Sequence, residues 1–468
     1  TDLDLGHYER FIDTNVSQLS NLTTGQVYQE VLRHERRGDF LGKTIQIIPH
    51  ITDAIQAYID KTARISKADF LLVEIGGTVG DIEGEPFLEA VREFHRAKGD
   101  PNVFFVHVTL LPFIMASQEL KTKPTQMSLG ELFRRGIHPD VVLCRSDYPL
   151  GMAERKKIAL FASIPTQAVI PAPTVKTIYE VPLILETQGI SKIIFSKFGL
   201  PNRKPNLKEW TKLVRRIAAE KPSVKIALVG KYTENNDAYI SVIEALKSAC
   251  YHTNVELDLL WVAAAKLEKN DKQEMAKLRK AQGIIVPGGF GSRGIEGKIF
   301  AAKYARENKI PYLGLCLGMQ VATIEFARHV LGTNDVNSTE FDQKTKNPVI
   351  HILPGQESIE DKGGTLRLGS YPCILNPKSI SYRAYGQRKI NERHRHRYEF
   401  NMDYREVLEK AGYVIAGISP NKKLVEIMEL KGHPFFVASQ FHPEFKSRPL
   451  RPHPLFKEFI RSVVKAAK

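Results

Sequence analysis

Cysteine is scarce in this sequence, and long apolar runs are absent from it. The 468 residues include four cysteines, at positions 144, 250, 316 and 373, and no two of them form a C-x-x-C pair. This scarcity argues against a disulfide framework and against a structural zinc site. No apolar run reaches the roughly 18 residues that a membrane span requires. We therefore expect a protein of the reducing cytoplasm without a membrane partner.

Acidic residues are outnumbered by basic ones, which gives the chain a formal net charge of +15. A basic surplus attracts phosphate groups, whether they belong to nucleic acids or to small polyphosphates. The sequence has no nucleic-acid recognition motif and no basic low-complexity tail, so we expect no nucleic-acid partner. Two interpretations stay open: the charges bind small polyphosphates, or they form an ordinary solvated surface.

Strand and helix patterns alternate in two blocks, which predicts an α/β fold of two domains, each a mostly parallel sheet flanked by helices. Turn formers and charges at 199–206 mark the boundary between the blocks. We expect a first domain at 1–198, a linker with a bridging helix at 199–222, and a second domain at 223–468. The predicted strands are 44–48, 70–75, 103–109, 141–144, 168–170, 224–229, 255–261, 283–286, 312–316, 424–430 and 435–440, and the predicted helices include 85–98, 127–135 and 207–220.

The most informative motif is Gly-Leu-Cys-Leu-Gly at 314–318, which follows the apolar run 310–313. It predicts a strand that enters a tight turn with Cys316 at its tip, the thiol counterpart of the G-x-S-x-G nucleophile elbow. Glycines on both sides allow the sharp turn, and the N-terminus of the following helix favours a thiolate. Downstream, His442 and Glu444 supply an imidazole base and a carboxylate that can orient it.

A second glycine-rich turn follows the apolar run 283–286. Its glycines let backbone N–H groups approach a ligand closely, as an oxyanion hole requires. A dinucleotide site is the competing interpretation, because 289–294 match G-x-G-x-x-G ahead of a helix. That site would need an acid at the end of the next strand, about 20 residues on, where this sequence has Cys316.

These three stretches resemble the class I (triad) glutamine amidotransferases. The resemblance implies that Cys316 attacks the glutamine amide, that His442 is the general base and that Glu444 orients the imidazole. Gly289 and Leu317 are the expected backbone donors to the oxyanion. Gln320, at the end of the cysteine motif, is expected to belong to the same glutamine site.

Histidines alternate with arginines within 391–399, so His394 and His396 share a face if this stretch is a strand. A metal pair and a plain polar strand are both open interpretations. Together with 337–341, the stretch narrows the resemblance to the CTP synthase family. The resemblance then implies that Glu340 holds the ammonium end of glutamine and that Arg397 holds its carboxylate, which is a chemically apt pairing.

The first block carries three further motifs similar to CTP synthases, at 2–11, 73–83 and 121–126. By this resemblance Asp4 and Glu74 are the expected Mg²⁺ ligands, because Mg²⁺ takes one or two carboxylates together with phosphate oxygens. Glu74 is also expected at the carboxyl end of a strand, where ligands bind in open sheets. The residues expected to bind UTP or the product CTP, partly with a neighbouring subunit, are Asp81, Ile82, Glu83, Lys121, Thr122, Lys123, Pro124, Thr125, Gln126 and Lys157.

A Walker-like stretch at 38–44 is one residue short of a P-loop and is expected ahead of a strand, so we do not expect it to bind phosphate. In the CTP synthase family the P-loop precedes the motif that here begins at Asp2, and we expect such a segment ahead of Thr1.

The resemblance implies ATP-dependent amination of UTP to CTP with ammonia from glutamine. It also implies activation by GTP, feedback inhibition by CTP, homotetramers and, in some members, filaments. Two alternatives remain: another class I amidotransferase with a different ammonia acceptor, or a non-catalytic filament subunit or scaffold. The motifs at 81–83 and 121–126 argue against the first alternative.

Overall fold

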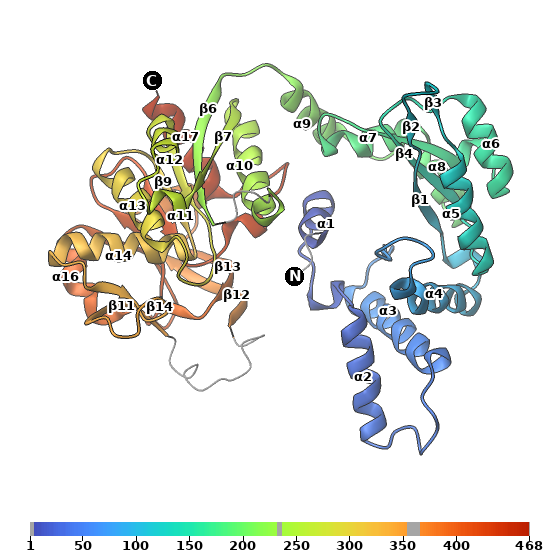
Figure 1. Ribbon diagram of the computed structural model, residues 1–468, viewed down its shortest axis with the longest axis horizontal. Coiled ribbons are helices and arrows are strands. Elements are labelled where there is room, and N and C mark those ends of the chain that lie inside the picture. Colours follow the sequence, from blue (N-terminus) through green and yellow to red (C-terminus); the bar gives the residue numbers. More distant parts are fainter. Residues whose placement is uncertain (1–3, 232–235, 353–365, 468) are drawn as a thin grey trace. The chain divides into compact units, whose positions relative to one another are not determined.

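The computed structural model describes residues 4–231, 236–352 and 366–467, and the chain divides into two compact units (Figure 1). The first unit joins residues 1–15 to 218–468, and the second consists of 16–217. The predicted domains differ from this division in two respects. The N-terminal helix packs with the C-terminal part of the chain, and the predicted linker at 199–222 is divided, with 199–217 in the second unit and 218–222 in the first. In the described ranges, every helix is too short or too polar to cross a membrane.

A nine-stranded mixed sheet forms the centre of the first unit. Its order is β13 (Lys389–His396), β12 (Arg367–Leu375), β15 (Tyr413–Ile418), β16 (Val425–Leu430), β17 (Phe436–Ser439), β9 (Tyr312–Leu315), β8 (Gly283–Val286), β6 (Ser223–Gly230) and β7 (Glu256–Ala263). The strands from β17 to β7 pair in parallel, and those from β13 to β17 pair antiparallel. The α/β fold class is confirmed, with an antiparallel extension to the parallel part.

Helices cover both faces of this sheet, because the central strands are buried on both sides. The four residues of β8 and the four of β9 are all buried, as expected for parallel strands between two helical layers. One core cluster packs α11 (Ala264–Leu267), α12 (Lys272–Lys280), α13 (Ile295–Glu307), α14 (Leu317–Leu331) and α16 (Arg405–Lys410) on the sheet. The opposite cluster contains α10 (Ile240–Thr253), α15 (Ile380–Tyr385) and α17 (Pro454–Ala466).

Two smaller pieces complete the first unit. A three-stranded sheet joins β10 (Val336–Ser338), β11 (Asn347–Ile352) and β14 (Tyr398–Phe400). The N-terminal helix α1 (Asp4–Ile12) belongs to this unit as well. Its Gly6 lies beside α10, since a Cβ built on Gly6 would be 3.5 Å from Ser241 Oγ.

The second unit is built on a three-stranded parallel sheet in the order β1 (Val106–Leu110), β4 (Val141–Ser146) and β5 (Val169–Pro173). A short hairpin joins β2 (Phe113–Ile114) to β3 (Glu119–Leu120). The helices are α2 (Thr24–Arg36), α3 (Thr52–Ser66), α4 (Glu85–Lys98), α5 (Lys123–Arg134), α6 (Met152–Ala162), α7 (Val181–Thr187), α8 (Ile190–Lys197) and α9 (Lys208–Ala218). The predicted helix 85–98 is confirmed, whereas α5 begins four residues before the predicted 127.

Two predicted strands are wrong. Residues 44–48 and 70–75 form no strand, and the first run leads instead into a helical turn, η2 (Ile47–Ile51). Their composition favours strands, but a strand is stable only where a neighbour supplies hydrogen bonds, and no described strand pairs with either run. Leu72 is 87% exposed. Glu74 therefore does not follow a strand, which removes the sheet-edge argument for it.

Candidate active site

Cys316 lies at the sharp turn between β9 and α14, as the sequence predicts. Its backbone adopts φ 52° and ψ −100°, a left-handed conformation that is strained for a residue with a Cβ. The Cys316 N–H donates to Ser439 O at 2.7 Å, which anchors the turn to the neighbouring strand β17. Strain that the surrounding structure holds in place is typical of a nucleophile elbow.

The flanking glycines are required by close backbone approach. A Cβ on Gly318 would lie 2.1 Å from Val286 O, and a Cβ on Gly314 would lie 2.7 Å from the Gly318 carbonyl. Real Cβ atoms do not approach other atoms this closely, so a larger residue at either position would move the turn. The two glycines thus fix where Cys316 stands relative to β8.

His442 lies beside Cys316 and carries Glu444 on its far side. Its Nδ1 is 2.7 Å from Glu444 Oε1. Both Cys316 and His442 border Gly288, since a Cβ on Gly288 would be 2.8 Å from His442 Cε1 and 3.6 Å from Cys316 Cβ. The structure therefore brings the three predicted catalytic residues together in one buried cluster.

Electrostatics favour a protonated imidazole in this cluster. Burial is the largest single influence and lowers the pKa of His442, but the Glu444 carboxylate and the Cys316 sulfur together outweigh it and raise that pKa to about 10. An imidazole that is charged at neutral pH can stabilise a thiolate beside it and can give its proton to a leaving group.

The predicted oxyanion turn borders the thiol and is held from behind by a buried lysine. A Cβ on Gly289 would lie 3.5 Å from Leu317 Cδ2 and 3.8 Å from Lys298 Nζ. Lys298 is fully buried on α13, and its Nζ donates to Pro287 O at 3.1 Å. Burial lowers the pKa of Lys298 to about 7. The sequence analysis missed this residue, although its place on the apolar face of α13, between Ile295 and Ile299, was a usable signal.

Two glutamines line the other side of the thiol. Gln440 Nε2 is 3.7 Å from Cys316 Sγ, and Gln320 Nε2 donates to Tyr398 O at 3.0 Å and to Gln440 Oε1 at 3.5 Å. Gln320, a predicted glutamine-site residue, therefore contacts Gln440, the residue that reaches the sulfur. Gln440 lies two residues before His442 in the sequence, but only the fold shows that it reaches the sulfur.

Glu340 lies across the mouth of the glycine-rich turn. Its Oε1 accepts the Gly291 N–H at 2.9 Å. Burial raises the pKa of Glu340, while Gly291, Lys231 and Arg397 each act to lower it. Arg397 is thus close enough to influence the charge on Glu340, which places the two predicted glutamine-holding groups in the same part of the first unit.

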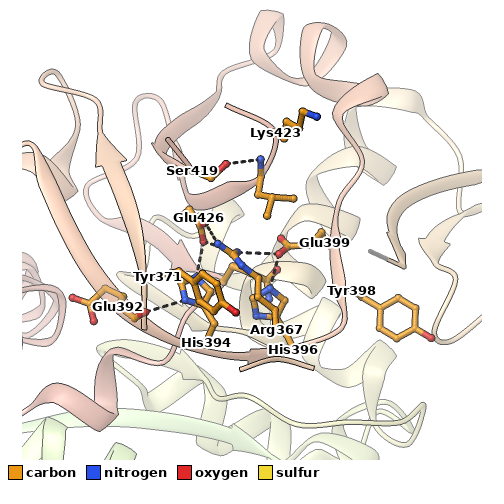
Figure 2. Close-up of polar contacts among 12 residues, drawn as sticks. Arg367, Tyr371, Glu392, His394, His396, Tyr398, Glu399, Ser419, Lys423 and Glu426 are labelled. Carbon is orange, nitrogen blue, oxygen red and sulfur yellow. Dashed lines mark hydrogen bonds and ion pairs between the residues drawn. The ribbon is translucent and has the colours of Figure 1, made fainter. Parts of the chain in front are cut away.

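His394 and His396 share the inner face of β13, and Figure 2 shows a carboxylate against each ring. His394 Nε2 is 2.7 Å from Glu426 Oε2, and His396 Nε2 is 2.6 Å from Glu399 Oε1. Arg367 bridges the two glutamates, at 2.7 Å from Glu426 and 3.1 Å from Glu399. Because these imidazole nitrogens already have protein partners, the arrangement favours a buried hydrogen-bond network over a metal pair.

The predicted UTP and CTP residues lie in the second unit, around α5 and its neighbours. Lys123, Pro124, Thr125 and Gln126 form the first turn of α5. Thr125 is fully buried, and its hydroxyl is 3.1 Å from Thr109 Oγ1. Thr122 is also buried, and its hydroxyl accepts from Gln126 at 3.3 Å. These two hydroxyls brace the turn, so the lysines are its exposed groups.

Lys121 and Lys157 face the same carboxylate. Lys121 pairs with Glu119, and this contact, with a smaller contribution from Lys157, lowers the pKa of Glu119. Asp81 begins the turn η3 (Ile82–Gly84), and its Oδ2 accepts the Thr78 N–H at 3.1 Å. Ile82 is 83% exposed, and Glu83 is exposed as well.

The two expected metal ligands belong to different units, Asp4 to the first and Glu74 to the second. Their pairing therefore remains a prediction. In the described ranges, no three His, Cys, Asp or Glu side chains form a group that could hold a metal ion.

Comparisons with known proteins agree with both halves of this description. The family model for the CTP synthase N-terminus matches residues 1–200, and the model for class-I glutamine amidotransferases matches 235–462. The CTP synthase of Chloroflexus aurantiacus is 59% identical over 460 residues, which cover 98% of this chain and 84% of that protein. The CTP synthase of Roseiflexus castenholzii is 58% identical over 461 residues, 98% of this chain and 83% of that protein.

One solved structure, the Trypanosoma brucei CTPS glutaminase domain with bound acivicin, is 40% identical and covers 52% of this chain and 94% of its own, with a TM-score of 0.49. The matches to the family models and to the two full-length relatives span both units of the structure. The chain therefore belongs to the CTP synthase family.

Proposed function

We propose that this protein aminates UTP to CTP, using ATP and ammonia that it releases from glutamine. The observation that carries the proposal is the cluster of Cys316, His442 and Glu444 beside the glycine-rich turn, in a chain whose first 200 residues match the CTP synthase N-terminus. A hydrolytic site alone would fit many amidotransferases, and the matched N-terminal half specifies the acceptor.

In the first half-reaction, the Cys316 thiolate attacks the amide carbon of glutamine. The Gly289 and Leu317 N–H groups are the proposed donors to the oxyanion. His442, protonated at neutral pH because its pKa is about 10, gives its proton to the leaving nitrogen as the C–N bond breaks. Ammonia departs and a glutamyl thioester remains on Cys316.

In the second half-reaction, water attacks the thioester carbonyl, and the now neutral His442 takes the proton from that water. The C–S bond breaks, glutamate leaves and the thiolate is restored. Glu444 keeps the imidazole in one orientation through its contact with Nδ1. Glu340 and Arg397 are the proposed holders of the ammonium and carboxylate ends of glutamine.

In the synthetase half, ATP phosphorylates the uracil 4-oxygen, and ammonia then displaces the phosphate. Lys121, Lys123 and Lys157 are the proposed contacts to the triphosphate of UTP or CTP, with Asp81, Ile82 and Glu83 beside them. Asp4 and Glu74 would hold Mg²⁺, which neutralises phosphate charge when bound. The basic balance of the chain suits these polyphosphate substrates.

We propose the remaining family properties together: GTP activates the glutaminase, CTP inhibits by feedback, and the protein forms homotetramers that in some conditions join into filaments. We also propose a cytoplasmic location. All four cysteines are free thiols, which fits a reducing compartment.

The test is CTP formation from UTP and ATP, supplied either with glutamine or with ammonium chloride. Replacement of Cys316 by Ala should lower glutamine-dependent synthesis by about 10³-fold or more, because it removes the nucleophile. Ammonia-dependent synthesis should persist. Cys250→Ala, at another buried free thiol, is the matched control and should retain both activities.

Three results would contradict the proposal. Full glutaminase activity in Cys316→Ala would reject the nucleophile. Glutamine hydrolysis without CTP formation under either nitrogen source would indicate a different acceptor. The absence of both activities in the natural protein would favour a scaffold.

A further inference from the structure

The N-terminal helix α1 belongs by sequence to one half of the protein and packs with the other. Residues 1–200 match the CTP synthase N-terminus, yet residues 1–15 pack in the unit that carries Cys316 and His442. Within this helix Glu9 is 3% exposed, which is unusual for a glutamate on a nine-residue amphipathic helix.

Glu9 binds the strand that positions His442. Arg393, on β13, donates from Nη1 to Glu9 Oε2 at 2.9 Å and from Nη2 to Oε1 at 2.5 Å, a bidentate pair. The carbonyl of the same Arg393 accepts the His442 N–H at 2.8 Å. Arg393 thus connects the Glu9 carboxylate to the backbone of His442, the proposed general base.

Glu9 also binds the segment that follows Glu444. Arg448, itself 3% exposed, has its Nη2 3.4 Å from Glu9 Oε2. Its Nη1 donates to Phe445 O at 3.0 Å and to Ser447 O at 3.1 Å, which closes the turn η9 (Pro443–Lys446) around Glu444. The Phe445 ring stacks on His442, with ring centroids 5.0 Å apart.

We propose that Glu9 is a positioning residue through which the synthetase part of the chain holds the His442–Glu444 pair in its hydrolytic geometry. The Glu9 carboxylate supports the backbone of His442 through Arg393 and the turn that contains Glu444 through Arg448. The helix that carries Glu9 begins at Asp4, the proposed Mg²⁺ ligand. This inference rests on the proposed function.

The experiment measures glutamine hydrolysis in the full protein after Glu9→Gln, which keeps the shape and removes the charge. We expect kcat to fall by about 10- to 100-fold, because small displacements of reacting groups cost rate on this scale. KM for glutamine should stay within about twofold, since the contacts of Glu9 to Arg393 and Arg448 support the His442 side of the site. Ammonia-dependent CTP synthesis should be retained.

Arg451→Gln is the matched control. Arg451 pairs with Asp13 of the same N-terminal segment at 2.8 Å, but its side chain is 69% exposed. Its removal should leave kcat unchanged. Glu9→Asp, which keeps the charge on a shorter side chain, should recover part of the lost rate and covers the case that Glu9→Gln does not fold.

A double-mutant cycle sharpens the test. Glu9→Gln and Arg393→Gln remove two ends of one contact, so their effects on kcat should not add. Additive effects, an unchanged kcat in Glu9→Gln, or an equal loss of glutamine- and ammonia-dependent synthesis would each overturn the inference. Glutamine hydrolysis by Cys316→Ala is assayed in parallel. If the proposed function is wrong, Cys316→Ala still hydrolyses glutamine; if only the inference about Glu9 is wrong, Cys316→Ala does not.

Discussion

The two units of this protein place their candidate residues in opposite environments. In the first unit Cys316, His442 and Glu444 are 4%, 8% and 5% exposed, and buried partners hold each of them in place. In the second unit Lys157 and Ile82 are exposed. Along β1, the exposed residues Val106, Val108 and Leu110 alternate with two buried ones.

The hydrolytic site and the proposed nucleotide site differ in how closely their residues are packed together within one unit. The hydrolytic site is assembled within one unit, so its geometry and its charge state follow from the chain alone. The nucleotide site presents separate basic groups, and the exposed apolar residues of β1 are of the kind that proteins cover with other elements.

The largest effect that tests this contrast is expected from Glu444→Gln. Removing the carboxylate leaves the imidazole without its anchor and lowers the pKa of His442, which Glu444 helps to raise. By analogy with triads that lose their orienting carboxylate, kcat for glutamine hydrolysis should fall by about 10²- to 10⁴-fold. The His442 limb of the pH–rate profile should move to lower pH.

The pH–rate profile between about pH 6 and 11 measures both changes, because this range extends past the His442 pKa of about 10 in the parent protein. Glu406→Gln is the control, because Glu406 is an exposed acid that pairs with Lys410 on the surface. A Glu444→Gln variant with the rate and profile of the parent would show that the buried site is not organised by this carboxylate.

A smaller effect is expected from Lys157→Ala in the second unit. Loss of one charge-assisted phosphate contact should raise KM for UTP by about 10-fold, with little change in glutaminase activity. The adjacent Lys156 is equally exposed on α6, so Lys156→Ala is the matched control. Equal effects of the two substitutions would point to a diffuse basic surface rather than a defined phosphate contact.

The smallest change in activity, but a measurable change in stability, is expected from Lys298→Met. Burial lowers the pKa of Lys298 from 10.5 to about 7 in the folded state. The unfolded chain therefore binds more protons between about pH 7 and 10.5, so this lysine makes the protein more stable as pH rises through that window. Methionine removes the charge and the penalty of burying it.

Lys298→Met should raise the free energy of unfolding by roughly 1–3 kcal/mol at pH 6 and by less at pH 9. Chemical denaturation at the two pH values gives the comparison, with Lys303→Met at an exposed position of α13 as the control. A gain that does not depend on pH would mean that the buried amine does not titrate as described.

Local sequence patterns predicted the elbow well because its requirements are local. Gly314, Cys316 and Gly318 lie within five residues, and the close approach of Gly318 to Val286 leaves no space for a side chain. The turn after β8 was predictable for the same reason. The catalytic trio followed once two short motifs were assigned to one family.

Features that depend on distant partners were not predictable in this way. The apolar run 70–75 has the composition of a strand, but no described strand pairs with it. Glu9 has no local signal, because its burial comes from Arg393 and Arg448, which lie more than 380 residues further along the chain. Lys298 breaks an apolar pattern, but only the fold shows that its amine supports the Pro287 carbonyl.

The most direct test of the central claim follows the amide nitrogen of glutamine. The protein is given ATP, UTP and glutamine labelled with ¹⁵N in the amide, and the product CTP is analysed by mass spectrometry. We predict that the label enters the CTP amino group and that Cys316→Ala abolishes this transfer while still forming unlabelled CTP from added ammonia. CTP that remains unlabelled in the parent protein, or a label that survives loss of the thiol, would contradict the account.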